Sequence, residues 1–411
     1  MKKILIIILL CLVTSGIAYS EAISYKDEGF ISYKERLNDL IALALASNPN
    51  LKAASTNVLG SEAMESADTS LNDPKLEFGM DSMLAKMVSI SQEFPITGKL
   101  SLKGDIAKLD TKLSSTTFTD TKNSLIMDVK LTYFQIEFLD RSIEIAQKNK
   151  ELLKQLISIV ETKYSVGSGF QIDVMKSQLE LSNVLNNLVI LKQGRDTAVA
   201  RLNTLLNRDI HTPFEVTAPL TVTPFAYAFN DIMILTETNS TLLQSSKIET
   251  EKRRLTQSLA KTEYYPDLMI KLSYTQNPVT PDVYSAFIGV TIPIWINSRQ
   301  SKVAGAEIGI KESIERYSAS FNNLSFKIME ILSVIERSKT QIDLYKTGII
   351  PQAELALGSA VSGYQVNSVD FLTLTSLRLE LFKYEIEYNE FIKEHEAAIA
   401  ELSAIVGLEL P

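Results

Sequence analysis

The sequence predicts a mainly α-helical chain with a small β part, built from two internal structural repeats. Its 411 residues contain only 16 glycines and 12 prolines, which cluster, so very long stretches hold neither helix breaker. In one such stretch, from Leu131 to Ile159, apolar residues recur at steps of three, four or seven, the spacing of helices that pack lengthwise. Four short segments alternate apolar and polar residues instead, as strands do.

The repeat rests on five short motifs that occur twice in the same order. They pair residues 48–51 with 239–242, 73–76 with 265–268, 94–96 with 292–294, 163–167 with 363–367, and 205–207 with 405–407. Ordered self-similarity of this kind indicates a duplicated unit. We therefore expect a first repeat at 21–206, a linker at 207–230 and a second repeat at 231–411.

Each repeat is expected to contain a helix, two strands between prolines, a very long helix, a tight turn and a returning helix. The helices are predicted near residues 35–70, 98–165, 170–206, 231–263, 299–364 and 367–406. The two longest would each reach roughly 100 Å at the rise of an α-helix, so they must pack along other helices rather than around one globular core. An ordinary coiled coil would explain these helices but not the strands.

The strands are predicted at residues 76–82, 87–94, 268–275 and 285–292. Leu76 and Phe78 share one face, for example, while Glu77 points to the other. This alternation fits a small soluble sheet at the end of a helical rod, and it also fits a membrane barrel with a polar lumen. Four strands cannot close around a lumen, and an open sheet edge cannot face lipid, so a barrel would need several chains.

The first twenty residues have the pattern of a secretory signal peptide. Lys2 and Lys3 precede an apolar stretch at 4–13, and small residues follow at Ala18 and Ser20. A membrane anchor at the N-terminus, or a lipid on Cys11, are the alternatives. Cys11 is the only cysteine, so a cut after residue 20 would leave a mature chain without disulfide or thiolate chemistry.

Composition also limits the functional class. The formal net charge of −8 disfavours binding to nucleic acid, which needs concentrated positive charge. No phosphate loop or nucleophile elbow occurs, so we expect no catalytic residue, no cofactor and no metal site. Glu394, His395 and Glu396 superficially resemble a metal cluster, but adjacent helical positions diverge, and a solvated helix face is the expected reading.

Three segments beside the predicted strands resemble those of TolC-like outer-membrane efflux proteins: residues 91–99, 265–268 and 290–295. The resemblance covers nearly the whole mature chain. It implies a homotrimer in the cell outer membrane, with a twelve-stranded β-barrel, a periplasmic α-barrel of antiparallel coiled-coil helices and an equatorial region around residues 207–230.

The same resemblance implies a function, that of the passive exit duct of a tripartite efflux or secretion system. Its partners would be outer-membrane lipid, a periplasmic adaptor (membrane fusion) protein and an inner-membrane transporter. The form of residues 92–99 is similar to the heavy-metal cation branch of the family. A periplasmic coiled-coil protein without a pore is the alternative function.

The tight turns at 165–170 and 365–369 are the candidate functional site. The resemblance implies a periplasmic gate at Asp370 and Asp173, with Thr373 in the place of a second gate aspartate. Rings of carboxylates favour cations and hold protons longer, although an aspartate there also caps a helix. The resemblance further implies adaptor docking at the turns, through Val166, Gly167, Ser168, Gly169, Val366, Asn367 and Ser368.

Overall fold

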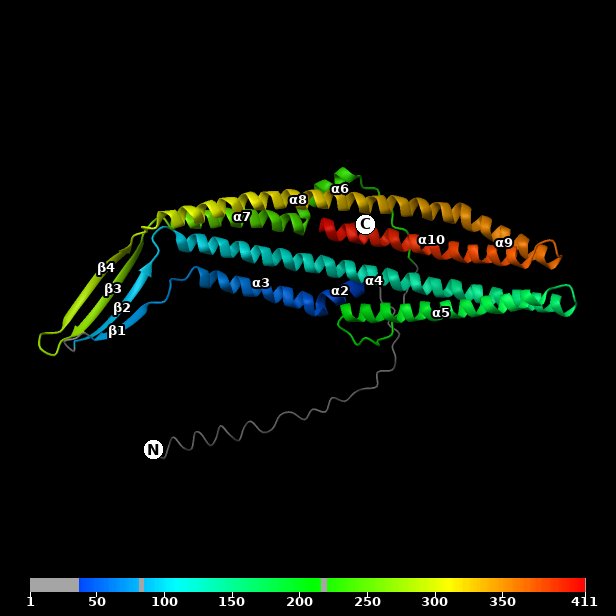
Figure 1. Cartoon of the computed structure of the whole chain (residues 1–411), viewed down its shortest axis with the longest axis horizontal. Helices are drawn as coiled ribbons and strands as arrows, with labels where there is room; N and C mark the ends of the chain where they lie inside the picture. The colour runs from blue at the N-terminus through cyan, green and yellow to red at the C-terminus, as the bar shows by residue number, and fades with distance from the viewer. Residues whose placement is uncertain (1–36, 81–84, 216–219, 411) are drawn as a thin grey trace, which may run out of the picture.

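The protein is described by a computed structural model for residues 37–80, 85–215 and 220–410. The predicted signal peptide and Cys11 lie outside these residues. The described part is a long rod of helices with a small sheet at one end and, at the other, two tight turns that each connect a pair of helices (Figure 1).

The first half of the chain runs through helices and strands in the predicted order. These are α2 (Leu37–Ser47), α3 (Pro49–Asp68), β1 (Lys75–Met80), β2 (Lys86–Phe94), α4 (Lys99–Ser165) and α5 (Gln171–Leu205). The prediction of a single helix near 35–70 is wrong, because the helix is interrupted at Asn48. Its side chain accepts hydrogen bonds from the N–H groups of Asn50 and Leu51, and Pro49 starts the next helix.

The second half has the same order of elements. It contains α6 (Phe229–Asn239), α7 (Thr241–Thr262), β3 (Asp267–Gln276), β4 (Val283–Thr291), α8 (Ile296–Leu344), the π-helical turn η1 (Tyr345–Ile349), α9 (Ile350–Gln365) and α10 (Phe371–Val406). The helix predicted near 231–263 breaks at Ser240, whose backbone is extended. The helix predicted near 299–364 is interrupted by η1, which apolar periodicity does not reveal.

The four strands form one antiparallel sheet in the order β1-β2-β3-β4. Each lies within two residues of its prediction, except that the expected end of the first, residues 81–82, falls outside the described residues. The central pairing joins the two halves, since Val88 of β2 lies opposite Tyr274 of β3.

The apolar face of this sheet is the exposed one. Phe78 is 75% exposed and Ile288 is 78% exposed, whereas Ser89 on the opposite face is only 2% exposed. On the opposite face, polar side chains bond to one another, because Ser89 donates a hydrogen bond to Glu77, and Lys271 forms an ion pair with Glu77 at 2.6 Å. A soluble sheet would bury its apolar face instead.

The helices pack lengthwise in two overlapping sets. Toward the sheet, α4 lies between α3 and α7, and α7 packs on α8; toward the turns, α4 lies between α5 and α10, and α10 packs on α8 and α9 (Figure 1). The apolar core follows these seams as separate clusters along the rod, typified by Ile136, Ile328 and Leu374. In the described part of the chain, no helix combines the length and apolar character needed to cross a membrane.

Candidate functional site

The turn between α4 and α5 depends on two glycines. Gly167 has a φ of 76°, in the left-handed region that suits glycine. A Cβ on Gly169 would lie 3.1 Å from the backbone nitrogen of Tyr164, a tight contact that a larger residue could make only if the backbone shifted. Val166 and Phe170 are left exposed on the outside of this turn.

The turn between α9 and α10 reaches the same shape with different residues. Asn367 takes the left-handed position with a φ of 61°, and the N–H of Ser368 donates to the carbonyl of Gly363 at 2.9 Å. Gly363 itself must lack a side chain, because a Cβ would lie 2.6 Å from Val369 Cγ2. Val366 is exposed, as Val166 is in the first turn.

Lys163 joins the two turns, a contact that the sequence did not predict. Its Nζ donates to the backbone carbonyl of Tyr364 and, at 2.5 Å, to Oδ1 of Asn367. The ammonium also lies over the Tyr364 ring, 4.3 Å from its centroid. One signal was available, since Lys163 begins the motif at 163–167, whereas the similar motif at 363–367 begins with Gly363.

Asp370 caps α10. Its Oδ1 accepts a hydrogen bond from the N–H of Thr373 at 2.7 Å. This hydrogen bond, with smaller contributions from the Thr373 side chain and the N–H of Leu372, lowers the pKa of the Asp370 carboxyl. The capping role is therefore visible in the geometry, and the gating role stays a prediction.

The pKa of Asp173 shifts in the opposite direction. It lies in the first helical turn of α5, three residues after the N-cap residue Phe170. Partial burial raises the pKa of its carboxyl, and the nearby charge of Asp370 raises it further, while Lys176 and Lys163 oppose the shift. The structure thus brings the two predicted gate aspartates close enough to interact within one chain.

A buried arginine lies beneath the turns and was also missed. Arg378 of α10 is 1% exposed, and its guanidinium donates to Asn149 of α4 at 2.7 Å and to Glu180 of α5 at 3.4 Å. Burial lowers the pKa of Arg378, but a guanidinium remains charged in proteins. Arg378 therefore ties the second helical hairpin to both helices of the first.

The expectation of a solvated helix face at Glu394, His395 and Glu396 is wrong for the last two. His395 is 1% exposed, with Nε2 2.9 Å from the carbonyl of Thr223. Glu396 accepts from the Thr223 N–H at 2.7 Å and from its hydroxyl at 2.8 Å. The linker covers this face of α10, which a helical pattern alone cannot show.

The first half holds the linker by analogous contacts. Arg195 of α5 forms an ion pair with Asp140 of α4 and donates to the carbonyl of Phe214 at 2.9 Å. Glu137 of α4 accepts from the N–H of Leu220 at 3.1 Å. The segment after α5 is thus fastened to helices of both halves near the middle of the rod.

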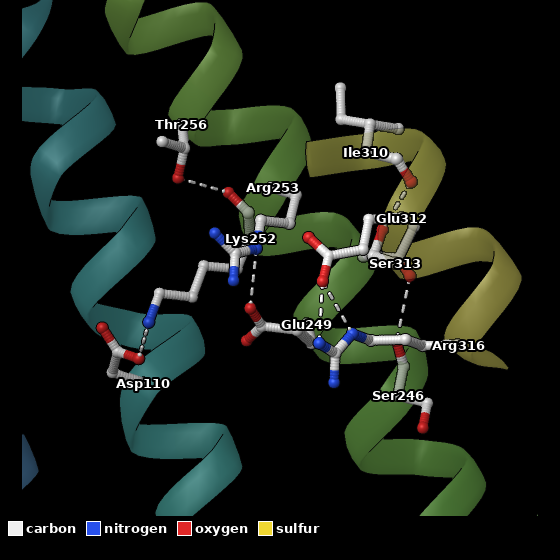
Figure 2. A network of polar contacts seen from close by, with 11 residues as sticks. Asp110, Ser246, Glu249, Lys252, Arg253, Thr256, Ile310, Glu312, Ser313 and Arg316 are labelled. Atoms are coloured by element: carbon white, nitrogen blue, oxygen red, sulfur yellow. Dashed lines mark hydrogen bonds and ion pairs between the residues drawn. The ribbon is translucent and has the colours of Figure 1, made fainter. Parts of the chain in front are cut away.

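Charged side chains nearer the sheet are paired with one another. Figure 2 shows Lys252 of α7 reaching Asp110 of α4, while Arg253 bonds to Glu249 and Arg316 to Glu312. The first pair joins two neighbouring helices, and the other two each lie within one helix, α7 or α8. Among the described residues, no group of three or more His, Cys, Asp or Glu is placed to hold a metal ion.

Comparison with known proteins confirms the predicted resemblance. Residues 40–208 match the outer membrane efflux protein family. The cobalt-zinc-cadmium resistance protein CzcC of Cupriavidus metallidurans is 21% identical over 376 residues, covering 90% of each chain. Toxin and drug export protein A of Aggregatibacter actinomycetemcomitans is 24% identical over 209 residues, 47% of this chain and 46% of that protein.

The fold is similar to that of solved outer-membrane proteins. The structure of VceC from Vibrio cholerae superposes with a TM-score of 0.77 at 14% identity, covering 91% of this chain and 97% of that chain. The likeness therefore covers most of the length of both chains.

Proposed function

We propose that this outer-membrane efflux protein is the passive exit duct of a tripartite efflux or secretion system, and that three copies of it enclose one channel. The observation that carries the proposal is the sheet, whose apolar face is exposed and whose opposite face carries polar side chains that bond to one another. A sheet with lipid outside and a wet lumen inside has this arrangement. A coiled-coil rod without a pore leaves the exposed apolar face unexplained.

The register of the sheet supports a continuous lipid-facing band. One row across the strands reads Leu76, Ile90, Leu272 and Ala286, and the next reads Phe78, Val88, Tyr274 and Tyr284. The intervening row on the other face reads Glu77, Ser89, Ser273 and Ser285. In these rows the two faces therefore differ in polarity, although Met269 and Phe287 also lie on the polar face.

Exposed aromatic residues lie toward both ends of this band. Tyr284 stacks on Tyr274 toward the hairpin ends, and Tyr265 and Trp295 lie exposed where the sheet meets the helices. The seven residues from Leu268 to Tyr274 span about 20 Å at the rise of a strand, close to the apolar height of an outer-membrane barrel. Aromatic girdles at both interfaces are typical of such barrels.

The free sheet edges support assembly. Within the described residues, β1 and β4 each pair on one side only. An unpaired edge cannot face lipid, and pairing β1 of one copy with β4 of the next would satisfy both edges. Three copies would then give a closed barrel of twelve strands, an even number in the usual range.

The helical rod would extend from the outer membrane into the periplasm. Helix α4 has 67 residues, which corresponds to roughly 100 Å. The exposed turns at its far end would dock the periplasmic adaptor through Val166–Gly169 and Val366–Ser368. Copies of Asp173, Asp370 and Thr373 would line the gate there, with the inner-membrane transporter supplying the energy.

We further propose that the two halves, 21–206 and 231–411 joined by the linker 207–230, are structural repeats, supported by their shared order of elements. The similarity to a cobalt-zinc-cadmium resistance protein along most of the chain favours divalent metal cations as cargo.

Membrane fractionation and channel recording test the proposal together. We expect the full chain to fractionate with outer membranes, to require detergent, to migrate as a heat-modifiable trimer, and to conduct ions in a planar lipid bilayer. A soluble monomer would instead support the coiled-coil alternative.

A matched pair of variants tests the orientation of the sheet. Ile288→Lys puts a charge on the exposed apolar face of β4, where lipid contact costs about 2–4 kcal/mol near the bilayer centre. Ser285→Lys puts the same charge on the polar face of the same strand. We expect only Ile288→Lys to abolish membrane-inserted trimer, and equal loss in both variants would contradict the assignment of faces.

A further inference from the structure

The two connections from the sheet to the long helices differ at one position. Pro95 follows β2 and Pro293 follows β4, and each proline lies shortly before the helix that leaves the sheet. Two residues after these prolines the first half has Thr97, whereas the second half has Trp295, the only tryptophan of the chain. Trp295 is 73% exposed, although most of the area of so large an apolar side chain is usually covered.

Trp295 belongs to an exposed apolar patch at the sheet end of the rod, where β4 leads into α8 (Figure 1). Four exposed apolar residues make up this patch, which we call the ledge: Ile292, Ile294, Trp295 and Ile296. Ile292 keeps the alternation of the exposed Ile288 and Val290, so the ledge continues the apolar face of the sheet. Contiguous exposed apolar surface of this kind marks an interaction site.

The strand alone is shorter than the apolar layer that it would cross. The eight steps from Tyr284 to Ile292 span about 26 Å along the chain direction. Strands of outer-membrane barrels tilt by about 40°, which leaves about 20 Å along the membrane normal, whereas the apolar band of such barrels is about 25 Å tall. The rest of the ledge would supply the missing height on the helical side.

Two cationic side chains of α8 lie next to the ledge. Arg299 and Lys302 are three residues apart, so they share one face of the helix. The Arg299 guanidinium points back toward the ledge, because it donates to the carbonyl of Trp295 at 3.1 Å and to that of Glu263 at 2.7 Å. These bonds use two of its five N–H groups. Lys302 forms an exposed ion pair with the Glu263 carboxylate at 2.7 Å.

The order of these groups matches the order of groups in a phospholipid. Isoleucine side chains suit acyl chains, an indole favours the boundary between the apolar layer and water, and a guanidinium binds phosphate through paired N–H groups. The distance also fits, since the six steps from Ile296 to Lys302 rise about 9 Å along α8. Glu263 offsets one of the two positive charges, and the remaining charge favours an anionic headgroup.

We propose that the ledge, together with Arg299 and Lys302, is a binding site for an anionic phospholipid on the periplasmic side of the outer membrane. The isoleucines contact the acyl chains, Trp295 lies at the level of the glycerol, and Arg299 binds the phosphate. Each copy of the chain has this site on its second half, and the first half lacks the tryptophan. The orientation of the site in the membrane rests on the proposed function.

The fluorescence of Trp295 tests the contact with lipid directly, because no other tryptophan contributes to the signal. The full chain is reconstituted into phosphatidylcholine vesicles whose acyl chains carry bromine, a quencher, either near the headgroup or near the methyl end. We expect stronger quenching by bromine near the headgroup. Absent quenching, which would mean that a neighbouring copy covers Trp295, or stronger quenching by the deeper bromine would overturn the site.

The headgroup preference tests the charges. A small share of brominated phosphatidylglycerol is added to unbrominated phosphatidylcholine, and we expect quenching of Trp295 to show about five-fold enrichment of the anionic lipid over its bulk share, the effect of one net charge at a membrane surface. Lys302→Gln should abolish the enrichment, and Glu263→Gln, which removes the opposing charge, should raise it about five-fold further. Equal quenching by anionic and zwitterionic brominated lipid in the unmodified chain would overturn the headgroup preference.

Arg299→Gln tests the phosphate contact, and we expect it to abolish the enrichment as Lys302→Gln does. Arg316→Gln is the matched control, because it breaks an exposed ion pair with Glu312 farther along the same helix and should leave the enrichment unchanged. Since Arg299 also bonds to the backbone, Lys302→Gln and Glu263→Gln decide the matter if Arg299→Gln does not assemble. Enrichment that persists in Lys302→Gln, or that Glu263→Gln leaves unchanged, would overturn the site.

Sedimentation with vesicles and conductance separate this site from the proposed duct. A chain that does not associate with vesicles would refute the duct and the lipid site with it. A chain that inserts as a trimer and conducts ions, but whose Trp295 is not quenched by brominated lipid, would overturn the lipid site alone.

Discussion

The two helical hairpins end side by side and have the same order of elements, yet different residues hold them. At the position where α4 has Lys163, α9 has Gly363, and where α5 has the exposed Gln178, α10 has the buried Arg378. Each polar anchor reaches across to the other half: Lys163 holds the second turn, and Arg378 holds Asn149 and Glu180. Lys163 and Arg378 thus form an interlock between the hairpins that two identical hairpins would lack.

Removal of Arg378 should disturb this interlock most. Arg378→Ala leaves Glu180 and Asn149 partly buried without their partner, and breaking a buried ion pair costs about 3 kcal/mol. We expect the free energy of unfolding to fall by about this amount, as measured by circular dichroism during a denaturant titration. Gln178→Ala, at the corresponding exposed position of α5, should change it little, and similar losses in both variants would refute the assigned asymmetry.

Removal of the Lys163 ammonium should have a smaller and more local effect. Lys163→Met keeps the apolar stem but removes the hydrogen bonds to Tyr364 and Asn367, worth about 1–3 kcal/mol for a charged donor. We expect faster hydrogen exchange of the amides at 363–369. Lys154→Met, which breaks only an exposed ion pair with Glu151, serves as the control and should leave that exchange unchanged.

The charge of Asp370 can be separated from its capping role. Asp370→Asn keeps a good N-cap but removes the carboxylate, whereas Asp370→Ala removes both. If three copies line a gate, we expect both variants to raise single-channel conductance or to weaken block by multivalent cations, with Asp370→Ala also loosening the start of α10. Conductance and block that match the unmodified channel in both variants would count against the carboxylate ring.

The opposite pKa shifts of Asp173 and Asp370 predict that the channel responds to acid in two stages. This effect is expected to be smaller than those of the substitutions above. Asp173, whose pKa is raised, binds a proton more tightly in the folded chain, so acidification neutralises it first and relieves its unfavourable burial. Asp370, whose pKa is lowered, keeps its charge further down, and its contribution to stability is lost only as the pH falls through that lowered pKa.

We therefore expect cation block to weaken in two steps as the pH falls, measured by bilayer recording. Asp173→Asn should remove the step at higher pH and leave the other. A single step in the unmodified channel would show that the two carboxyls titrate together.

The sequence located the strands well because period-two alternation and flanking prolines are local signals. The sequence did not predict the helix breaks at Asn48 and Ser240 or the π-helical turn η1, because the apolar spacing continues across them. The contacts of Lys163 and Arg378 were not predicted for another reason. Their partners lie about 200 positions away, and no local pattern indicates which helices are neighbours. The capping role of Asp370 could be predicted because a helix cap depends on residues only three positions apart.

The sheet has a consequence for the biogenesis of the chain. Strand β2 pairs with β1 but finds its second neighbour only in β3, and Lys99 at the start of α4 pairs at 2.6 Å with Asp267, 168 positions later. Pairings so distant in sequence form slowly, because a large loop must close first. A nascent chain that has emerged only as far as α5 holds a two-stranded ribbon with an apolar face and an open edge, so it needs protection from aggregation until the second half arrives.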